Sequence, residues 1–331
     1  MSDNLRWALL STANINQALI EPIRQGPRSE LAAVASRNPE TAQAYADEWS
    51  IPKAYGSYEA LLADPEIDVI YNPLPNSLHA EWTIRAAEAG KHVLCEKPIV
   101  LSLEELDRVE AAARDNGVTI FEAFMYLHHP QTRTVQEMVR SGEMGPLRQI
   151  NSWFNYYLPP GGNIRLFPDL GGGSLWDVGV YPNSLAIVMA GGRAPVEVWG
   201  QQVTAENGVE VIFTGQMRFE NGAVAQIESA FRTPFRQGAQ VVGEQTAVWI
   251  DEPWKPGSEG DDSRIVITHA DESEETVVFP APSPYLCEVE AMEACVLDGA
   301  DPVVPLSLSR EFLRTILALY ESARSGRPVM V

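Results

Sequence analysis

The sequence predicts an α/β protein in two parts: an N-terminal doubly wound parallel sheet, then an α+β domain with a large, mostly antiparallel open sheet. Three observations support this. The 331 residues suffice for two domains of about 150 residues each. Up to about residue 125, short continuous apolar runs alternate with helical patterns, which is typical of parallel strands covered on both faces. Beyond Pro130, longer strand-like runs predominate and helices are few.

The elements of the first part follow from short apolar runs bounded by turn residues. Proline at position 39 marks the start of one helix, because its fixed φ suits the first helical position. We expect strands at residues 5–10, 31–35, 68–71, 92–95 and 118–122, and helices at 15–24, 39–49, 77–89 and 103–116.

The second part contains one clear hairpin signal. Asn221-Gly222 lies between two strand-like runs, as in a two-residue turn whose residues have positive φ. We expect domain limits at 1–125 and 126–305, with a last helix, 306–331, packing near the first domain. Strands are expected at 149–156, 196–203, 209–219, 223–230, 240–242, 246–251, 264–268 and 275–279, and helices at 174–189, 285–297 and 306–325.

Composition and charge exclude several classes of protein. With 24 basic and 45 acidic residues the net charge is −21, so nucleic acid and anionic membranes would be repelled. Three cysteines without metal-ligand spacing favour free thiols in a reducing compartment, and we expect a cytoplasmic protein. Only four cations are lysine, so a lysine at a reactive position stands out.

The first strand–turn–helix is a natural place for a pyrophosphate, because helix N-terminal amides point at the ligand there. The turn reads Ser11-Thr12-Ala13-Asn14-Ile15, without the glycines of G-x-G-x-x-G. Small residues at 11 and 13 still allow a close approach of the backbone. Taken alone, the turn suits an ordinary βα connection better than a nucleotide loop.

The end of the second strand bears on the choice of nucleotide. An acidic residue there would hold the ribose 2′-hydroxyl of NAD, whereas Ser36 and Arg37 suit a 2′-phosphate. A solvated arginine beside a helix cap is the alternative. Given a dinucleotide fold, we favour NADP over NAD.

Two further segments end strands at the carboxyl edge of the sheet, where ligands bind in open α/β folds. One follows the strand at 68–71 and the other contains Glu96 and Lys97. Burial of Lys97 beside an oxidised nicotinamide would lower its pKa and make a neutral amine available as proton acceptor. An ion pair with Glu96 is the alternative. The first segment contributes the candidate residues Asn72, Leu74, Pro75, Asn76 and His79.

The segment 171–181 opens a helix with Asp177 and Tyr181 four residues apart, a spacing that puts both on one face. A buried aspartate needs a partner, so two polar groups at an apolar helix mouth indicate a site. His128-His129 with Asp177 is a weaker candidate for a metal, because adjacent histidines point apart and no third ligand is visible. We expect no metal.

Two stretches, AGKHVLCEKP at 89–98 and GGGSLWDVGVY at 171–181, carry a family resemblance. With the order of elements, they are similar over essentially the whole chain to the Gfo/Idh/MocA oxidoreductases (glucose–fructose oxidoreductase, inositol dehydrogenase, rhizopine catabolism). The glycine-poor first turn departs from the family pattern. LRWALLSTANI, PLPNSLHAEW and Tyr181 look most like the NADP-dependent D-xylose 1-dehydrogenases and dimeric dihydrodiol dehydrogenases. Leu127 stands where that branch often has arginine.

The resemblance implies a Rossmann domain that binds NADP (or NAD), a substrate domain, and a homodimer or homotetramer formed through the C-terminal sheet. Lys97 would contact the substrate hydroxyl and the nicotinamide region, and Asp177 would bind a sugar hydroxyl. Tyr181 would replace the histidine more widespread in the family, and Pro98 often follows a cis peptide. Cofactor contacts would come from Ser11, Thr12, Ala13, Asn14, Ile15, Ser36, Arg37, Asn72, Leu74, Pro75, Asn76, His79, Glu96 and Lys97.

The expected reaction moves a hydride between a sugar, polyol or diol carbinol carbon and the nicotinamide. Tyrosine, with a pKa near ~10, is a poor base unless cations stabilise the phenolate, so Lys97 would assist Tyr181 as proton acceptor. Exchange of these two roles is a variant. Redox-neutral, NAD-dependent glycoside cleavage and a non-catalytic cofactor sensor are the alternative functions. The presence of Lys97, Asp177 and Tyr181 together favours the dehydrogenase.

Overall fold

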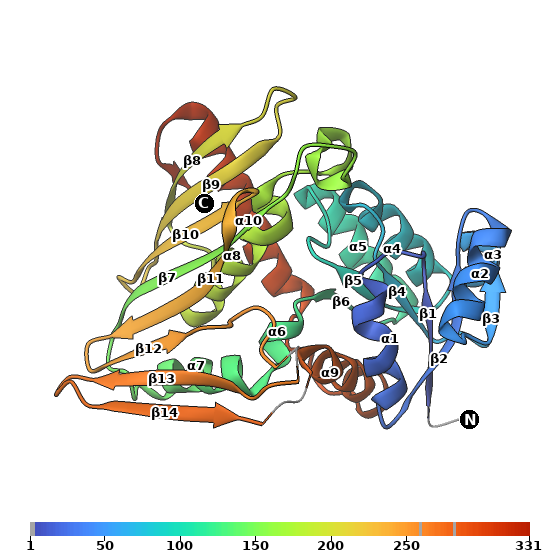
Figure 1. Ribbon diagram of the computed structural model, residues 1–331, viewed down its shortest axis with the longest axis horizontal. Helices are drawn as coiled ribbons and strands as arrows, with labels where there is room; N and C mark the ends of the chain where they lie inside the picture. The colour runs from blue at the N-terminus through green and yellow to red at the C-terminus, as the bar shows by residue number, and fades with distance from the viewer. Residues whose placement is uncertain (1–3, 258–259, 281–282) are drawn as a thin grey trace. The chain divides into compact units, whose positions relative to one another are not determined.

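The computed structural model describes residues 4–257, 260–280 and 283–331, which form two compact units (Figure 1). Unit 1 contains the chain up to Met125 together with Ser283–Leu306. Unit 2 contains Tyr126–Pro282 and Ser307–Val331. The domain limits expected from the sequence, 1–125, 126–305 and 306–331, stay a prediction.

Unit 1 is built on a six-stranded sheet in the order β3-β2-β1-β4-β5-β6. Every neighbouring pair is parallel, and the order reverses between β1 and β4 as in doubly wound folds. The strands are nearly continuous apolar runs because both faces are covered. They span Leu5–Leu9 (β1), Ser29–Ala35 (β2), Lys53–Tyr55 (β3), Val69–Asn72 (β4), His92–Glu96 (β5) and Ile120–Ala123 (β6).

Helices lie on both faces of this sheet (Figure 1). α4 packs with α5, and α1 packs with α9, which returns to unit 1 from late in the chain. Asn38 and Ser102 cap α2 and α5 by accepting a backbone N–H from the first turn. The helices span Asn16–Gln25 (α1), Pro39–Trp49 (α2), Tyr58–Leu62 (α3), His79–Glu88 (α4), Leu103–Asn116 (α5) and Pro284–Asp298 (α9).

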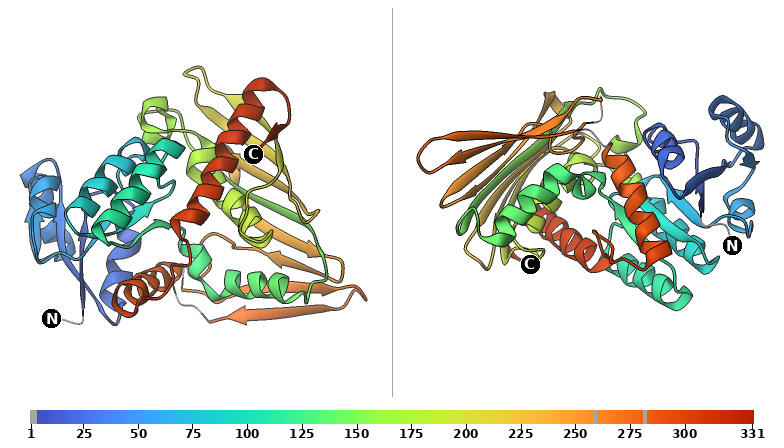
Figure 2. Two further views of the ribbon diagram at one scale, coloured as in Figure 1. Left: turned by 180° about the vertical axis from the view of Figure 1, so that it is seen from behind. Right: turned by 90° about the horizontal axis from the view of Figure 1, so that it is seen from below.

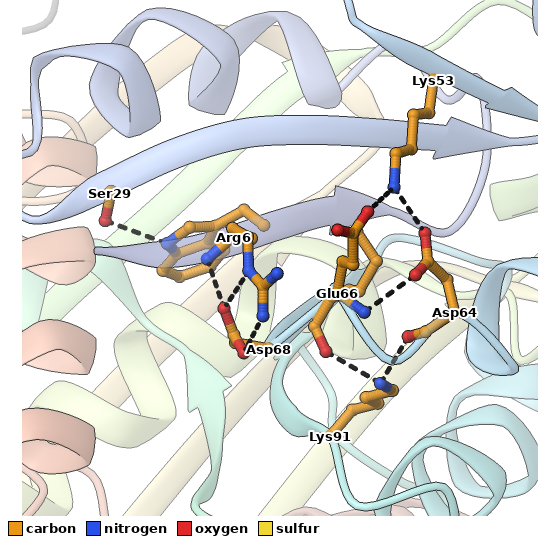
Figure 3. Close-up of polar contacts among 9 residues, drawn as sticks. Arg6, Ser29, Lys53, Asp64, Glu66, Asp68 and Lys91 are labelled. Carbon is orange, nitrogen blue, oxygen red and sulfur yellow. Dashed lines mark hydrogen bonds and ion pairs between the residues drawn. The ribbon is translucent and has the colours of Figure 1, made fainter. Parts of the chain in front are cut away.

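Charged groups join the segments at the amino ends of these strands, away from the carboxyl edge (Figure 3). Arg6 forms a bidentate pair with Asp68, at 2.9 and 3.1 Å. The buried Lys91 ammonium donates to the carbonyls of Asp64 and Ile67, at 2.7 and 2.8 Å. Lys53 forms an ion pair with the Asp64 carboxylate, so Lys53 and Lys91 both stabilise the fold at this end of the sheet.

Unit 2 is built on a nine-stranded sheet in the order β14-β13-β12-β11-β7-β10-β9-β8-β15. The β7–β10 pair is parallel and the other neighbours are antiparallel, which confirms the predicted fold class. The strands span Leu147–Tyr157 (β7), Glu197–Thr204 (β8), Glu210–Arg218 (β9), Val224–Ala230 (β10), Arg232–Gly243 (β11), Thr246–Ile250 (β12), Ser263–His269 (β13), Glu274–Phe279 (β14) and Val329–Met330 (β15).

Helices α7, α8 and α10 cover one face of this sheet and leave the other face bare (Figure 2). α8 is buried throughout its length and packs on β7 and β10. None of the helices in the described part of the chain is long and apolar enough to span a membrane. The helices of unit 2 are α6, which begins at the last residue of unit 1 (Met125–His128), α7 (Pro130–Ser141), α8 (Val180–Met189) and α10 (Leu306–Ser325).

Several expectations for unit 2 were wrong in detail. α6 and α7 were missed: α6 has only four residues, and α7 is mostly polar, with Gln131 and Thr132 at buried positions beside Val135 and Met138. The hairpin turn has three residues: Phe219 N–H donates to Ala223 O at 2.9 Å, and Gly222 alone has positive φ (+85°). This is a type I turn closed by a left-handed glycine. The helix expected at 174–189 begins as a π-helical turn, Leu175–Gly179, before α8.

Candidate functional site

The β1–α1 turn of unit 1 lies at the point where the strand order reverses. Leu10 N–H donates to Tyr71 O at 3.0 Å, so the turn adjoins the end of β4. Ser11 Oγ accepts from Ala13 N–H at 3.2 Å, and the buried Asn16 amide donates to Ser11 O at 2.6 Å. The helix is preceded by Ile15, whose side chain cannot cap it, and its first turn, 16–19, carries no acidic residue. These features leave the positive helix terminus suited to an anion.

The end of β2 carries the pair expected to select the nucleotide. Ser36 is buried against β3, where its N–H donates to Tyr55 O at 3.0 Å. Arg37 is exposed, and its cation favours ionisation of the Tyr58 hydroxyl although burial raises the pKa of that tyrosine overall. Arg37 therefore presents its charge outside the sheet at the carboxyl end of β2.

Asn72 and His79 tie two loops of the carboxyl edge together. The Asn72 amide is fully buried and donates to His79 O and Thr83 Oγ1, at 3.2 and 3.1 Å. The buried His79 ring lies 2.7 Å from Pro98 O through Nδ1 and 2.6 Å from Leu74 O through Nε2. The ring therefore bridges the 73–78 loop to the residue after Lys97. The Asn72 and His79 side chains are buried and make hydrogen bonds within the protein, whereas Pro75 and Asn76 are partly exposed.

Lys97 follows β5 directly and is partly buried, and the Lys97–Pro98 peptide is cis. Its neighbour Glu96 accepts a hydrogen bond from the fully buried Tyr71 hydroxyl at 2.6 Å. Burial and the Glu96 charge raise the pKa of Tyr71 well above its usual value, so Tyr71 is a neutral donor. The turn after Pro98 is held by Glu122, whose carboxylate accepts Ile99 N–H at 3.0 Å.

In unit 2, Asp177 lies on the π-helical turn and is largely buried, at 8% exposure. Its Oδ2 accepts a hydrogen bond from the Tyr156 hydroxyl at 2.8 Å and lies 2.9 Å from Arg165 Nε. Burial first, and then the Asp177 charge, raises the pKa of Tyr156, so this hydroxyl donates at all ordinary pH values. Asp177 is therefore a fixed hydrogen-bond acceptor. π-Turns of this kind occur frequently at functional sites.

Tyr181 is the second residue of α8, which continues the same segment, and is 5% exposed. Its ring is surrounded by those of Tyr126, Phe154 and Trp254, with centroid distances of 5.8, 5.6 and 5.8 Å. The Tyr126 hydroxyl also donates to the backbone carbonyl of Tyr181 at 3.4 Å and lies 2.7 Å from Ser184 Oγ. The phenol of Tyr181 is thus held in place by packing.

The structure brings the predicted residues into two groups, one in each unit. The turn 11–16, Arg37, Asn72, His79, Glu96 and Lys97 lie at the carboxyl edge of unit 1, and Asp177 and Tyr181 lie on one segment of unit 2. Their roles stay predictions. In residues 4–257, 260–280 and 283–331, no three His, Cys, Asp or Glu side chains are grouped as metal ligands. Sequence reasoning missed Tyr156 and Arg165, since only tertiary packing brings them to Asp177.

Comparison with known proteins agrees with this architecture. Residues 5–124 match the family model described as "Oxidoreductase family, NAD-binding Rossmann fold", and residues 132–248 match the GFO/IDH/MocA C-terminal domain. The chain is 40% identical to "D-xylose 1-dehydrogenase (NADP(+)) 2" of Haloferax volcanii, covering 98% of this chain and 99% of that one. It is 28% identical to trans-1,2-dihydrobenzene-1,2-diol dehydrogenase of Danio rerio, over 89% of each chain.

A solved structure shows the same fold over nearly the full length. The crystal structure of aldose-aldose oxidoreductase from Caulobacter crescentus, complexed with glycerol, superposes with a TM-score of 0.90 and 28% identity, covering 99% of this chain and 100% of that one. The two family models together cover the six-stranded sheet and strands β7 to β11 of the nine-stranded sheet. The chain therefore belongs to the Gfo/Idh/MocA family of oxidoreductases.

Proposed function

We propose that the protein is an NADP-dependent dehydrogenase that oxidises a sugar at its anomeric carbinol carbon, with D-xylose as the first substrate to test. The observation that carries the proposal is the Asp177 segment. A buried carboxylate fixed by two partners precedes, by four residues, a tyrosine fixed by three aromatic rings. This pair offers one acceptor for a sugar hydroxyl and one group for proton transfer. The likeness to a D-xylose 1-dehydrogenase supports the choice of sugar.

The residues of unit 1 fit NADP. The start of α1 carries no acidic side chain and suits a pyrophosphate, and the end of β2 carries Arg37 where an NAD-binding site would carry a carboxylate. Ser36 and Arg37 together would hold the 2′-phosphate, since a guanidinium matches phosphate geometry. When bound, the nicotinamide supplies the acceptor for the hydride.

In the proposed mechanism, Asp177 accepts a hydrogen bond from a sugar hydroxyl and so orients the ring. The anomeric hydroxyl gives its proton to the phenolate oxygen of Tyr181 as the hydride leaves the same carbon, which yields the lactone and a neutral Tyr181. The Lys97 ammonium would stabilise that phenolate by its charge before the transfer, because an unassisted phenol with a pKa near ~10 is almost wholly protonated at neutral pH and cannot accept a proton. Direct transfer of the proton to Lys97 is the variant that kinetics must separate from this one.

The test is NADP reduction at 340 nm with D-xylose, other aldoses, inositols and vicinal diols, in wild type, Tyr181→Phe and Lys97→Met. We expect turnover with wild type, loss of at least about 10²-fold in kcat in either variant, and NADP affinity within about threefold of wild type. Tyr157→Phe is the matched control, since Tyr157 is 60% exposed and adjoins Tyr156 on β7. Loss of cofactor binding in both variants would refute the assigned roles, and no turnover on any substrate would refute the dehydrogenase.

A homodimer formed through the bare face of the nine-stranded sheet completes the proposal. That face carries exposed Trp199, Val203 and Val224, and a hollow of about 530 Å³ lies over β7–β11. Aromatic side chains such as Trp199 are enriched at protein–protein interfaces. The three cysteines are free thiols, which is in keeping with the cytoplasmic location that we propose.

A further inference from the structure

A buried carboxylate in unit 2 has no part in the mechanism above. Glu210 is the first residue of β9, lies 4% exposed, and faces the segment that precedes Asp177. Its carboxylate accepts hydrogen bonds from Ser174 N–H at 2.7 Å, Leu175 N–H at 2.5 Å and the Tyr320 hydroxyl at 3.0 Å. A side chain of one strand thus binds the backbone at which the π-helical turn begins.

The contact is close enough to dictate the residue beside it. A Cβ on Gly173 would lie 2.4 Å from Glu210 Oε2 and 2.9 Å from its carboxyl carbon, and the φ of Gly173 is +136°. Only glycine allows the backbone to approach the carboxylate in this way. The glycine at position 173 of the GGGS sequence therefore lets the backbone pass close to the Glu210 carboxylate.

The contact between Glu210 and this backbone is coupled to Asp177 through the chain. Asp177 N–H donates to Gly173 O at 3.0 Å. The backbone that Glu210 binds therefore leads directly into the π-helical turn that carries Asp177. Ser174 Oγ adds one bond, to Ser229 O at 3.2 Å. A shift of 174–175 away from Glu210 would move the Asp177 carboxylate relative to Tyr156 and Tyr181.

We infer that Glu210 is a positioning residue for substrate binding: its carboxylate, held between β9 and α10, fixes the start of the π-turn and thereby the place of Asp177. The inference rests on the proposed function, in which Asp177 binds a sugar hydroxyl. Because the Glu210 carboxylate binds the backbone before Asp177 and the Tyr320 hydroxyl, we expect it to govern the KM for sugar and to leave NADP binding unchanged.

The protonation state of Glu210 sets the strength of this anchor. Burial raises its pKa to about 7, against the opposing effect of the three hydrogen bonds. The titratable groups that face it among the described residues are Tyr320 from α10 and Asp177 from the π-turn. All three direct partners of the carboxylate are donors, so the anion alone satisfies them together. The anchor, and with it sugar binding, should therefore weaken as pH falls through about 7.

The experiment measures the KM for D-xylose, kcat and the Kd for NADP from pH 5.5 to 8.5 in wild type and Glu210→Gln. We expect a wild-type KM that rises below pH 7, and a variant KM about tenfold higher at pH 8 with no inflection. We expect kcat within about threefold and the Kd for NADP within twofold of wild type. Glu206→Gln is the matched control, because Glu206 is an exposed carboxylate in the β8–β9 connection, four residues before Glu210. A wild-type KM and profile in Glu210→Gln would overturn the inference.

Tyr320→Phe gives a second, milder test if Glu210→Gln does not fold. Removing the phenol takes away a donor to the anion, so the inflection of KM should move to higher pH. An unchanged or lowered inflection would overturn the inference.

Backbone hydrogen exchange separates this inference from the proposed function. Peptides covering 173–178 should exchange faster in Glu210→Gln than in wild type, after correction for intrinsic rates, while β7 stays protected. If wild type turns over no sugar, the proposed function fails, and the exchange result still decides whether Glu210 anchors the turn. Unchanged protection of 173–178 would refute the anchor itself.

Discussion

Replacing Gly173 by alanine should destabilise unit 2 by about 4 kcal/mol. The backbone at φ +136° is open almost only to glycine, and forcing another residue into such a region costs about 1–3 kcal/mol. The new Cβ would also lie 2.4 Å from Glu210 Oε2, so the carboxylate must leave Ser174 N–H or Leu175 N–H. A hydrogen bond to a charged group contributes about 1.5–3 kcal/mol. The backbone cost and the loss of one such bond together give the expected destabilisation of about 4 kcal/mol.

Urea unfolding followed by tryptophan fluorescence measures this loss. With m of about 3 kcal/mol/M, the midpoint should fall by about 1.3 M, and the KM for D-xylose should rise in the folded variant. Gly162→Ala is the control, because Gly162 lies in the same connection, has an ordinary φ, and has open space where the Cβ would go. A midpoint for Gly173→Ala within about 0.2 M of the control would show that the Glu210 contact does not constrain this backbone.

Three further predictions concern the cofactor, the pH dependence and the bare sheet face. Arg37→Ala should raise the KM for NADP by about 10- to 100-fold and leave that for NAD unchanged, as one charge-assisted phosphate contact would dictate; equal effects on both cofactors would argue against a 2′-phosphate contact. Because folding raises the pKa of Glu210 to about 7 from an ordinary 4.5, the folded state binds the extra proton, and stability falls as pH rises between these values. Measured against Glu210→Gln, the wild-type free energy of unfolding should drop by about 3 kcal/mol from pH 4.5 to pH 8, and a rise would contradict the raised pKa. Val224→Lys should convert a dimer to a monomer in light scattering, whereas a wild-type monomer would exclude the proposed interface.

Most of the fold could be predicted because its strands and helices repeat apolar residues at regular periods. The helix predicted at 103–116 coincides with α5, and the strands of unit 1 were located to within two residues apart from the short β3. α7 escaped because Gln131 and Thr132 are buried in it. β11 was predicted only at 240–242, since its first half carries Arg232 and Arg236 at an irregular pairing with β7.

The candidate site could be predicted only where its residues share a local motif. Lys97 and Asp177 stand in short signature sequences, and Tyr181 follows Asp177 at helical spacing. The groups that hold Asp177 come from β7 and from a 3₁₀ turn, Ile164–Leu166, and Glu210 comes from another strand. No period or spacing connects those segments, so only packing shows that they meet.

Changes in the amino-acid sequence would affect the two partners of Asp177, Tyr156 and Arg165, differently. Tyr156 belongs to β7, a central strand of the sheet, and lies between Asn155 and Tyr157, which both pair with β11. Arg165 lies in the connection of 3₁₀ turns between β7 and the π-turn. Gly172, at the end of this connection, packs closely against Arg165 O. Insertions and substitutions in that connection can alter or remove the guanidinium while leaving the strand, the π-turn and the tyrosine in place. Substrate range can therefore diverge among descendants of this chain without rebuilding the groups that transfer the proton.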